Sequence, residues 1–186
     1  MFINRINKSV RFWLLSISLL LSACNDITKD LLPSSTDART AVVKGTLGGE
    51  VGQIIEDFSL LTTEGNVLSK DALLAAGQPL VLYFTMWCPV CDAHMSDYKS
   101  QIAPDFPGVH LVMVDFVSGN VENAYSSQIS AGYRNETVIV DDGTLESALY
   151  GSMGTTVVIG LDGVIRMNED YKTGNRLRSV LEVLSR

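Results

Sequence analysis

Basic residues, histidines and prolines are scarce in this chain of 186 residues. Lysine and arginine together number 14 against 21 aspartates and glutamates, and the net charge at pH 7 is −7. Because an acidic chain is repelled by phosphate groups, we expect neither a nucleic acid nor an anionic lipid surface as a binding partner. No proline follows Pro107, and the two histidines are His94 and His110. Any acid–base or metal chemistry of histidine therefore has to use one of these two side chains.

The first 23 residues contain the longest apolar run of the chain. Arg5, Lys8 and Arg11, with no acidic residue among them, precede the run from Phe12 to Ala23. A basic segment followed by so short a run is typical of a signal peptide, since the run is too short to cross a ~30 Å hydrocarbon core as a helix. A buried N-terminal helix is the alternative. We predict that residues 1–23 are a signal peptide.

A cysteine follows this run directly. The sequence LSAC, residues 21–24, resembles a bacterial lipobox, in which the signal is cut before the cysteine, the thiol is diacylated and the new N-terminus is acylated. Cys24 is therefore the expected lipidation site, because several acyl chains anchor a protein stably where one binds only marginally. An ordinary cleaved signal peptide with a nearby cysteine is the alternative. Asn25 and Asp26 leave open whether the inner or the outer membrane is the destination.

Residues 24–49 are polar, weakly periodic and interrupted by Pro33 and two adjacent glycines. This composition predicts a flexible, lipidated tether that carries a domain formed by residues 50–186. Lipidation of Cys24 leaves Cys88 and Cys91 as the remaining thiols of an extracytoplasmic protein, which is periplasmic if the bacterium is Gram-negative. Outside the cytoplasm, two such thiols are expected to form a disulfide.

Short apolar segments alternate with helical segments beyond residue 50. Residues 54–69 alternate in polarity about a Glu64-Gly65-Asn66 turn, which predicts an N-terminal β-hairpin. We expect an α/β fold with a central mixed sheet flanked by helices, and a working site at the carboxyl ends of its strands. Strands are expected at 79–84, 109–116 and 137–141 and as a pair within 155–167; helices are expected at 70–77, 88–102, 120–133, 144–151 and 174–186.

The motif WCPVC, residues 87–91, follows the first buried strand. A thiol attacks as thiolate, and a free cysteine with a pKa near ~8.5 is mostly protonated at neutral pH. Cys88 at a helix start would face unpaired N–H groups and the positive end of the helix dipole, and Pro89 suits the first helical turn. Cys91 would follow one turn later on the same face. We expect Cys88 to attack and Cys91 to resolve the mixed disulfide, with Trp87 as an apolar lip beside the sulfurs.

Two other roles compete for this pair of thiols. A structural disulfide that closes so small a loop would restrain the unfolded chain very little. A metal site would use Cys88, Cys91 and His94, which are three ligands where structural zinc normally takes four. His110 could be the fourth only if the fold brought it close, and we expect no metal site.

Several segments together carry a family resemblance. PLVLYFTMWCPVC, VHLVMVD, TVIVDD and TTVVIGLDGVI, within roughly residues 50–186, resemble the TlpA/ResA-like branch of the thioredoxin superfamily. The resemblance implies a thioredoxin fold and a membrane-tethered thiol–disulfide oxidoreductase whose redox centre is the Cys88–Cys91 pair, without another cofactor. It also implies exported protein thiols or disulfides as partners, together with a membrane electron donor or acceptor.

The sequence departs from this family in the loop before the fourth strand of that fold. Relatives have a cis-proline there, which helps to dock substrate backbones and to keep metals off the thiols. Alignment of TTVVI places Gly154 at that position, between Met153 and Thr155. We expect these three residues to bind substrate together with Trp87 and Pro89. A cis bond without proline costs ~2.5–4 kcal/mol, so the peptide before Gly154 is expected to be trans.

The second departure is His94, which stands where many relatives have a glutamate that moves the proton of the resolving thiol. His94 is the i+3 neighbour of Cys91 on the expected helix. An imidazole that titrates near ~6.5 can do the same work, so His94 is a candidate catalytic residue. The alternative is a solvated position on the helix surface.

Other functions remain open at this point. Thr85 precedes Cys88 by three residues, as in the PxxxTxxC motif of peroxiredoxin-type peroxidases, but Val81 occupies the place of the motif's proline and no arginine partner lies nearby. A copper- or zinc-binding lipoprotein using Cys88, Cys91 and His94 is another alternative. A lipoprotein with vestigial thiols and a binding role is a third.

Overall fold

The structure, a computed structural model, describes residues 41–185. The predicted signal peptide, Cys24 and most of the predicted tether lie outside the described residues. No helix within 41–185 combines the length and the apolar character needed to cross a membrane. The strands are β1 Ser59–Thr62, β2 Val67–Ser69, β3 Leu80–Thr85, β4 His110–Asp115, β5 Val138–Val140, β6 Thr155–Ile159 and β7 Ile165–Asp170. The α-helices are α2 Lys70–Ala75, α3 Pro89–Asp97, α4 Val121–Ser130, α5 Thr144–Leu149 and α6 Asn175–Leu184.

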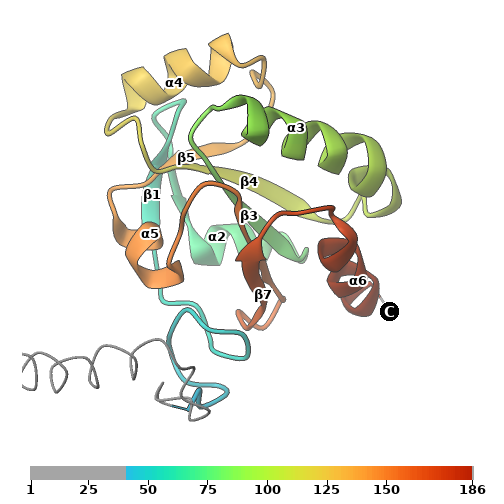
Figure 1. The fold of residues 1–186 in the computed structure, drawn as a ribbon. Coiled ribbons are helices and arrows are strands. Elements are labelled where there is room, and N and C mark those ends of the chain that lie inside the picture. The colour runs from blue at the N-terminus through green and yellow to red at the C-terminus, as the bar shows by residue number, and fades with distance from the viewer. Residues whose placement is uncertain (1–40, 186) are drawn as a thin grey trace, which may run out of the picture. The chain divides into compact units, whose positions relative to one another are not determined.

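These strands form one mixed sheet in the order β2-β1-β5-β4-β3-β6-β7 (Figure 1). Strands β3, β4 and β5 pair in parallel, while β6 and β7 continue the sheet antiparallel on one side. On the other side, the expected hairpin of β1 and β2 pairs antiparallel with β5. The predicted α/β architecture with an N-terminal hairpin is therefore confirmed.

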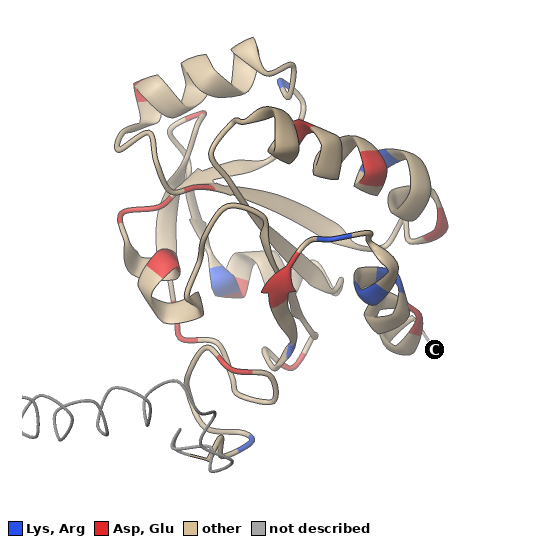
Figure 2. Cartoon of the chain, in the orientation of Figure 1, with Lys and Arg blue, Asp and Glu red and all other residues tan. Residues whose placement is uncertain are grey.

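Strand β3 is buried on both faces, which explains its unbroken apolar sequence. Val81 and Tyr83 point to one face, where they join residues of α3 and α6 in one apolar cluster. Leu80, Leu82 and Phe84 point to the other face and pack with residues of α2 and α5. Charged side chains lie on the helices, the strand ends and the loops, and β3 has none (Figure 2). Because β3 is buried on both faces, the hydroxyl group of Tyr83 lies in the protein interior.

Residues 49, 52 and 53 lie at the predicted boundary of the tether and contact α5 and β7. Gly52 N–H donates to the Ile165 carbonyl at 2.9 Å, and Ile165 N–H donates to the Gln53 carbonyl at 2.8 Å. Gly49 is buried, and a Cβ atom at this position would come within 2.0 Å of the Ala148 carbonyl oxygen. Glycine is required here because another backbone segment occupies the space of a side chain.

Helix α3 also ends earlier than expected. The α-helical hydrogen bonds stop at Asp97, and the chain continues as a π-helix over Tyr98–Ile102. Such a wider turn is frequently found near functional sites. Tyr98 and Ile102 are buried in it, while Asp97 accepts a hydrogen bond from the Tyr171 hydroxyl at 2.6 Å. The turn thus links α3 to the segment that follows β7.

Candidate active site

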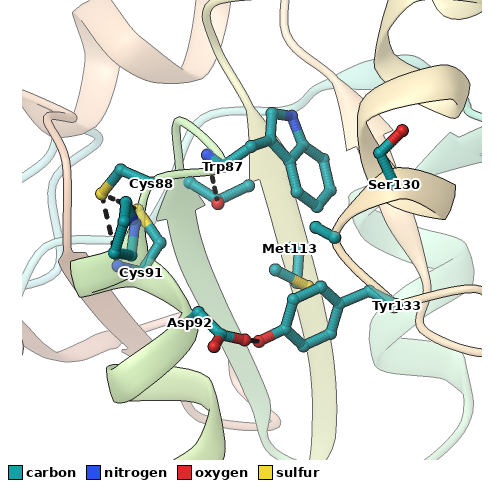
Figure 3. Close-up of a pocket in the computed structure, with 10 residues that line it drawn as sticks. Trp87, Cys88, Cys91, Asp92, Met113, Ser130 and Tyr133 are labelled. Carbon is teal, nitrogen blue, oxygen red and sulfur yellow. Dashed lines mark hydrogen bonds between the residues drawn. The ribbon is translucent and has the colours of Figure 1, made fainter.

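The two cysteines occupy the first turn of α3, directly after β3. Cys88 is the N-cap residue in extended conformation, and Pro89 is the first residue of the helix. The Cys88 sulfur accepts the Cys91 N–H at 3.3 Å and lies 2.9 Å from the Cys91 sulfur (Figure 3). Cys88 is partly exposed, whereas Cys91 is only 2% exposed. An incoming disulfide can therefore reach Cys88, and Cys91 is held behind it.

Hydrogen bonds stabilise negative charge on this pair. Burial disfavours a thiolate at Cys91, but hydrogen bonds from the Cys88 side chain, from the backbone of Met86 and Cys88 and from Thr85 outweigh it and lower the pKa of Cys91. Cys91 consequently forms a thiolate more readily than an isolated cysteine does.

Trp87 is fixed beside the sulfurs by a strained backbone and two hydrogen bonds. Its φ angle is +59°, in the left-handed region that non-glycine residues rarely adopt. The Trp87 N–H donates to the Thr85 hydroxyl at 3.1 Å, and its indole N–H donates to the buried Asp115 carboxylate at 2.7 Å. Strain of this kind persists only where the surrounding structure holds it in place. The indole is therefore a rigid wall next to Cys88.

A cavity of about 360 Å³ opens beside the cysteines (Figure 3). The Trp87 and Tyr133 rings stand on its walls with their centroids 6.4 Å apart. The Tyr133 hydroxyl donates to the Asp92 carboxylate at 2.5 Å, and this bond, together with burial, raises the pKa of Tyr133. The residues that line this cavity are Thr85, Trp87, Cys88, Pro89, Cys91, Asp92, Met113, Ser130, Ala131 and Tyr133.

The peptide bond before Gly154, in the loop that precedes β6, is trans as expected. No cis peptide bond occurs within residues 41–185, and Gly154 has a φ angle of +87°. Its N–H donates to the Phe84 carbonyl at 3.0 Å, and its carbonyl accepts from the Tyr171 N–H at 2.8 Å. Met153, at 37% exposure, presents its side chain to solvent. Thr155 is 3% exposed, and its hydroxyl is 3.4 Å from Asp170 Oδ1.

His94 is partly exposed and packs against aromatic rings. Its Nδ1 atom lies 3.0 Å from the Tyr83 hydroxyl, and its ring stacks on Tyr171 with a centroid distance of 4.8 Å. Burial lowers the pKa of His94, and the charge of Asp97 partly opposes this effect. Within the described residues, no hydrogen bond joins His94 directly to Cys91, although the two are i+3 neighbours on α3.

The structure separates the predicted metal ligands. Residues 41–185 contain no group of three histidine, cysteine or acidic side chains placed to hold a metal ion. His110 begins β4 beside Leu80, whereas the cysteines follow the far end of β3. His94 is engaged by Tyr83 and Tyr171.

Sequence reasoning missed four residues of the site: Tyr83, Asp115, Tyr133 and Tyr171. One signal was available for Tyr83, because a hydroxyl in the middle of a doubly buried strand needs a hydrogen-bond partner. Asp115 likewise ends a buried strand, where it accepts the backbone N–H groups of Val117 and Ser118. Tyr133 and Tyr171 lie in loops, where nothing in the local sequence indicates that they approach α3.

Comparison with known proteins agrees with this fold. The sequence profile of the AhpC/TSA family matches residues 51–167. The chain belongs to the AhpC/TSA family. No curated protein matches it.

Solved structures provide further likenesses. A proposed protein disulfide isomerase from Bacteroides thetaiotaomicron is 22% identical with a TM-score of 0.60, and the alignment covers 76% of this chain and 96% of that one. A secreted disulfide oxidoreductase from Mycobacterium tuberculosis, homologous to E. coli DsbE, is 25% identical with a TM-score of 0.53 and coverages of 68% and 96%. A proposed thiol:disulfide interchange protein DsbE from Chlorobium tepidum is 20% identical with a TM-score of 0.58 and coverages of 73% and 97%. The fold of this family member is thioredoxin-like.

Proposed function

We propose that this protein is an extracytoplasmic thiol–disulfide oxidoreductase that exchanges electrons with protein disulfides through Cys88 and Cys91. The observation that carries the proposal is the asymmetry of the pair at the start of α3: Cys88 is partly exposed and caps the helix, and Cys91 is buried 2.9 Å behind it. This arrangement lets the outer thiol exchange with a substrate and the inner thiol close the internal disulfide. The similar oxidoreductases from other bacteria support the same chemistry.

The surroundings of Cys88 suit a polypeptide substrate. Met86, Val90 and Met153 expose apolar side chains near the cysteine-bearing turn and the loop before β6, at 45%, 48% and 37% exposure. The cavity between Trp87 and Tyr133 is large enough for a side chain that neighbours the reacting sulfur of the substrate. We assign substrate contact to Trp87, Pro89 and Met153, with the backbone of Gly154 shaping the loop. No cofactor beyond the dithiol is required.

A thiol-exchange assay tests this function in the full-length protein with Cys24→Ser, so that Cys88 and Cys91 are the only thiols. The reduced protein is mixed with oxidised insulin, and insulin reduction is followed by mass spectrometry. Cys88→Ser should abolish exchange, because the accessible thiol is lost. Cys91→Ser should instead trap a mixed disulfide at Cys88. Exchange that survives Cys88→Ser would refute the proposal.

A thiol peroxidase is the nearest alternative, because the family match and Thr85 are compatible with it. The geometry gives this function less support. The Thr85 hydroxyl accepts the Trp87 N–H, and no arginine lines the cavity next to Cys88. Hydrogen peroxide offered to the reduced protein should oxidise the dithiol no faster than it oxidises a small free dithiol. Rapid turnover of peroxide would favour the alternative.

We further propose that Cys24 carries a lipid anchor that holds the protein on the outer side of a bacterial cytoplasmic membrane or on an outer membrane. The support is the LSAC sequence after a basic, apolar segment. Labelled palmitate should enter the wild-type protein but not Cys24→Ser, and the variant should leave the membrane fraction. The partners that follow from this location are exported proteins and a membrane electron donor or acceptor.

A further inference from the structure

One path of polar side chains leads away from the buried thiol and has no place in the exchange chemistry described so far. Tyr83 on β3 is fully buried in the same cluster as Cys91. Its hydroxyl lies 3.0 Å from His94 Nδ1, and the neighbouring Cys91 side chain contributes to the raised pKa of Tyr83. His94 itself is partly exposed. Tyr83 therefore stands between the buried thiol and an imidazole that reaches solvent.

Tyr83 remains a neutral phenol in these surroundings. Burial raises its pKa far above the ordinary value, and the nearby charge of Cys91 raises it further. A neutral hydroxyl has one proton to donate and lone pairs that accept, so it can pass a proton on without forming a tyrosinate. His94, whose pKa is lowered by burial, is unprotonated at neutral pH and has a free lone pair on one ring nitrogen.

The need for such a path arises in the mixed disulfide. Cys88 is then bonded to the substrate sulfur and has lost its S–H group. The hydrogen bond from Cys88 that helps to stabilise a Cys91 thiolate is consequently absent in this state. Cys91 is 2% exposed, so burial disfavours its thiolate and water reaches its proton poorly. Resolution by Cys91 thus requires an acceptor inside the protein.

We infer that Tyr83 relays the proton of Cys91 to His94 when the mixed disulfide is resolved, an inference that rests on the proposed exchange function. The Cys91 S–H proton moves to the Tyr83 oxygen while the Tyr83 hydroxyl proton moves to His94 Nδ1, which leaves a thiolate, a neutral tyrosine and an imidazolium. The thiolate attacks the Cys88 sulfur, the Cys88–Cys91 bond forms, and the bond to the substrate sulfur breaks. The substrate leaves as a thiolate with that electron pair. Over the whole reaction, the dithiol loses two electrons and the substrate disulfide gains two.

Few other titratable groups can interfere with this transfer. The Tyr171 hydroxyl donates a hydrogen bond to Asp97 at 2.6 Å. It is therefore not directed at His94, although the Tyr171 ring packs on the imidazole. The loop over residues 151–155, which approaches the other side of the imidazole at Gly154, has no titratable side chain. The titratable groups that face Tyr83 or His94 are Cys88, Cys91, Asp97, Tyr133 and Tyr171.

Stopped-flow reaction with 5,5′-dithiobis(2-nitrobenzoate) separates the two chemical steps in the full-length, reduced Cys24→Ser protein. Attack by Cys88 releases the first thionitrobenzoate, and resolution by Cys91 releases the second. Tyr83→Phe keeps the buried ring but removes the hydroxyl, so we expect the second phase to slow by roughly 100-fold or more at pH 7 and the first phase to stay unchanged. In the wild type the second phase should slow at acidic pH as His94 becomes protonated, and Tyr83→Phe should lose this dependence.

Tyr98→Phe is the matched control, since Tyr98 is another buried tyrosine of the same cluster and its hydroxyl has no hydrogen bond to Cys91 or His94 within residues 41–185. This variant should keep both phases and the slowing of the second phase at acidic pH. His94→Gln retains a hydrogen-bond acceptor but no base, so it should slow the second phase as Tyr83→Phe does, and the double variant should be no slower than either. If the second phase were as fast in both Tyr83→Phe and His94→Gln as in the wild type, the relay would be refuted. The exchange function would not be affected by that result. Absence of a second phase in the wild type would refute the exchange function itself.

Discussion

Proline at residue 154, the residue that the resemblance to the TlpA/ResA-like branch would place there, should damage this protein. Proline fixes φ near −65°, whereas Gly154 has a φ of +87°. Proline also lacks the N–H group that Gly154 donates to the Phe84 carbonyl at 3.0 Å, inside a fully buried strand. Gly154→Pro therefore introduces backbone strain and an unpaired buried acceptor together.

The size of the loss follows from these two costs. An unpaired buried acceptor costs about 1–3 kcal/mol, and a strained backbone residue costs about 1–3 kcal/mol. We expect the free energy of unfolding to fall by roughly 3 kcal/mol, which corresponds to roughly 10 °C in melting temperature for a domain of this size. Gly154→Ala avoids the lost hydrogen bond, so it should cost only the ~1–2 kcal/mol of a left-handed alanine.

Urea unfolding of the full-length protein, followed by circular dichroism, measures these differences. Gly132→Ala is the matched control for Gly154→Ala, because Gly132 has nearly the same φ of +85° but no atom within 4 Å of the added Cβ. Because the added Cβ at residue 154 would lie 3.4 Å from His94, an ordinary van der Waals distance, Gly154→Ala should cost about as much as the control. If Gly154→Pro unfolded at the wild-type urea concentration, with a cis peptide before residue 154, the reasoning would be refuted.

Three further changes test other parts of the site. Ala131→Phe should fill the cavity beside Cys88 and raise KM for oxidised insulin while the reaction with small disulfides is kept; equal effects on both would show that the cavity holds no substrate side chain. Trp87→Phe removes the indole bond to Asp115 and should lower the free energy of unfolding by about 1–3 kcal/mol, whereas an unchanged urea midpoint would contradict this role. Burial lowers the pKa of His94 and of His110 in the folded protein. The unfolded chain therefore binds more protons than the folded protein does as the pH drops below ~6.5. Stability should therefore fall as the pH drops from ~6.5 through the folded-state pKa values, and His110→Gln should lessen that fall in urea titrations; an identical fall would exclude His110 as a contributor.

The regular elements could be predicted because their patterns are local. The continuous apolar run of β3 and the paired alternation of β1 and β2 depend on burial of single strands, and Pro89 sets the start of α3. The sequence does not show that Gly49 lies against the carbonyl of Ala148, nearly a hundred residues away. The sequence likewise shows nothing of the contact between Tyr171 and α3, which exists only once β7 lies in the sheet.

The two departures from the related family meet at one place in this structure. A Cβ atom at residue 154 would lie 3.4 Å from Cε1 of His94, in ordinary van der Waals contact, so residue 154 is a direct neighbour of the imidazole. The imidazole lies beside this loop, with Tyr171 on its face and Tyr83 at Nδ1. A glutamate at residue 94 would have no ring to fill this space or to stack on Tyr171. The glycine and the histidine are thus two parts of one packing arrangement, and it is this arrangement that holds an imidazole at hydrogen-bonding distance from the hydroxyl beside the buried thiol.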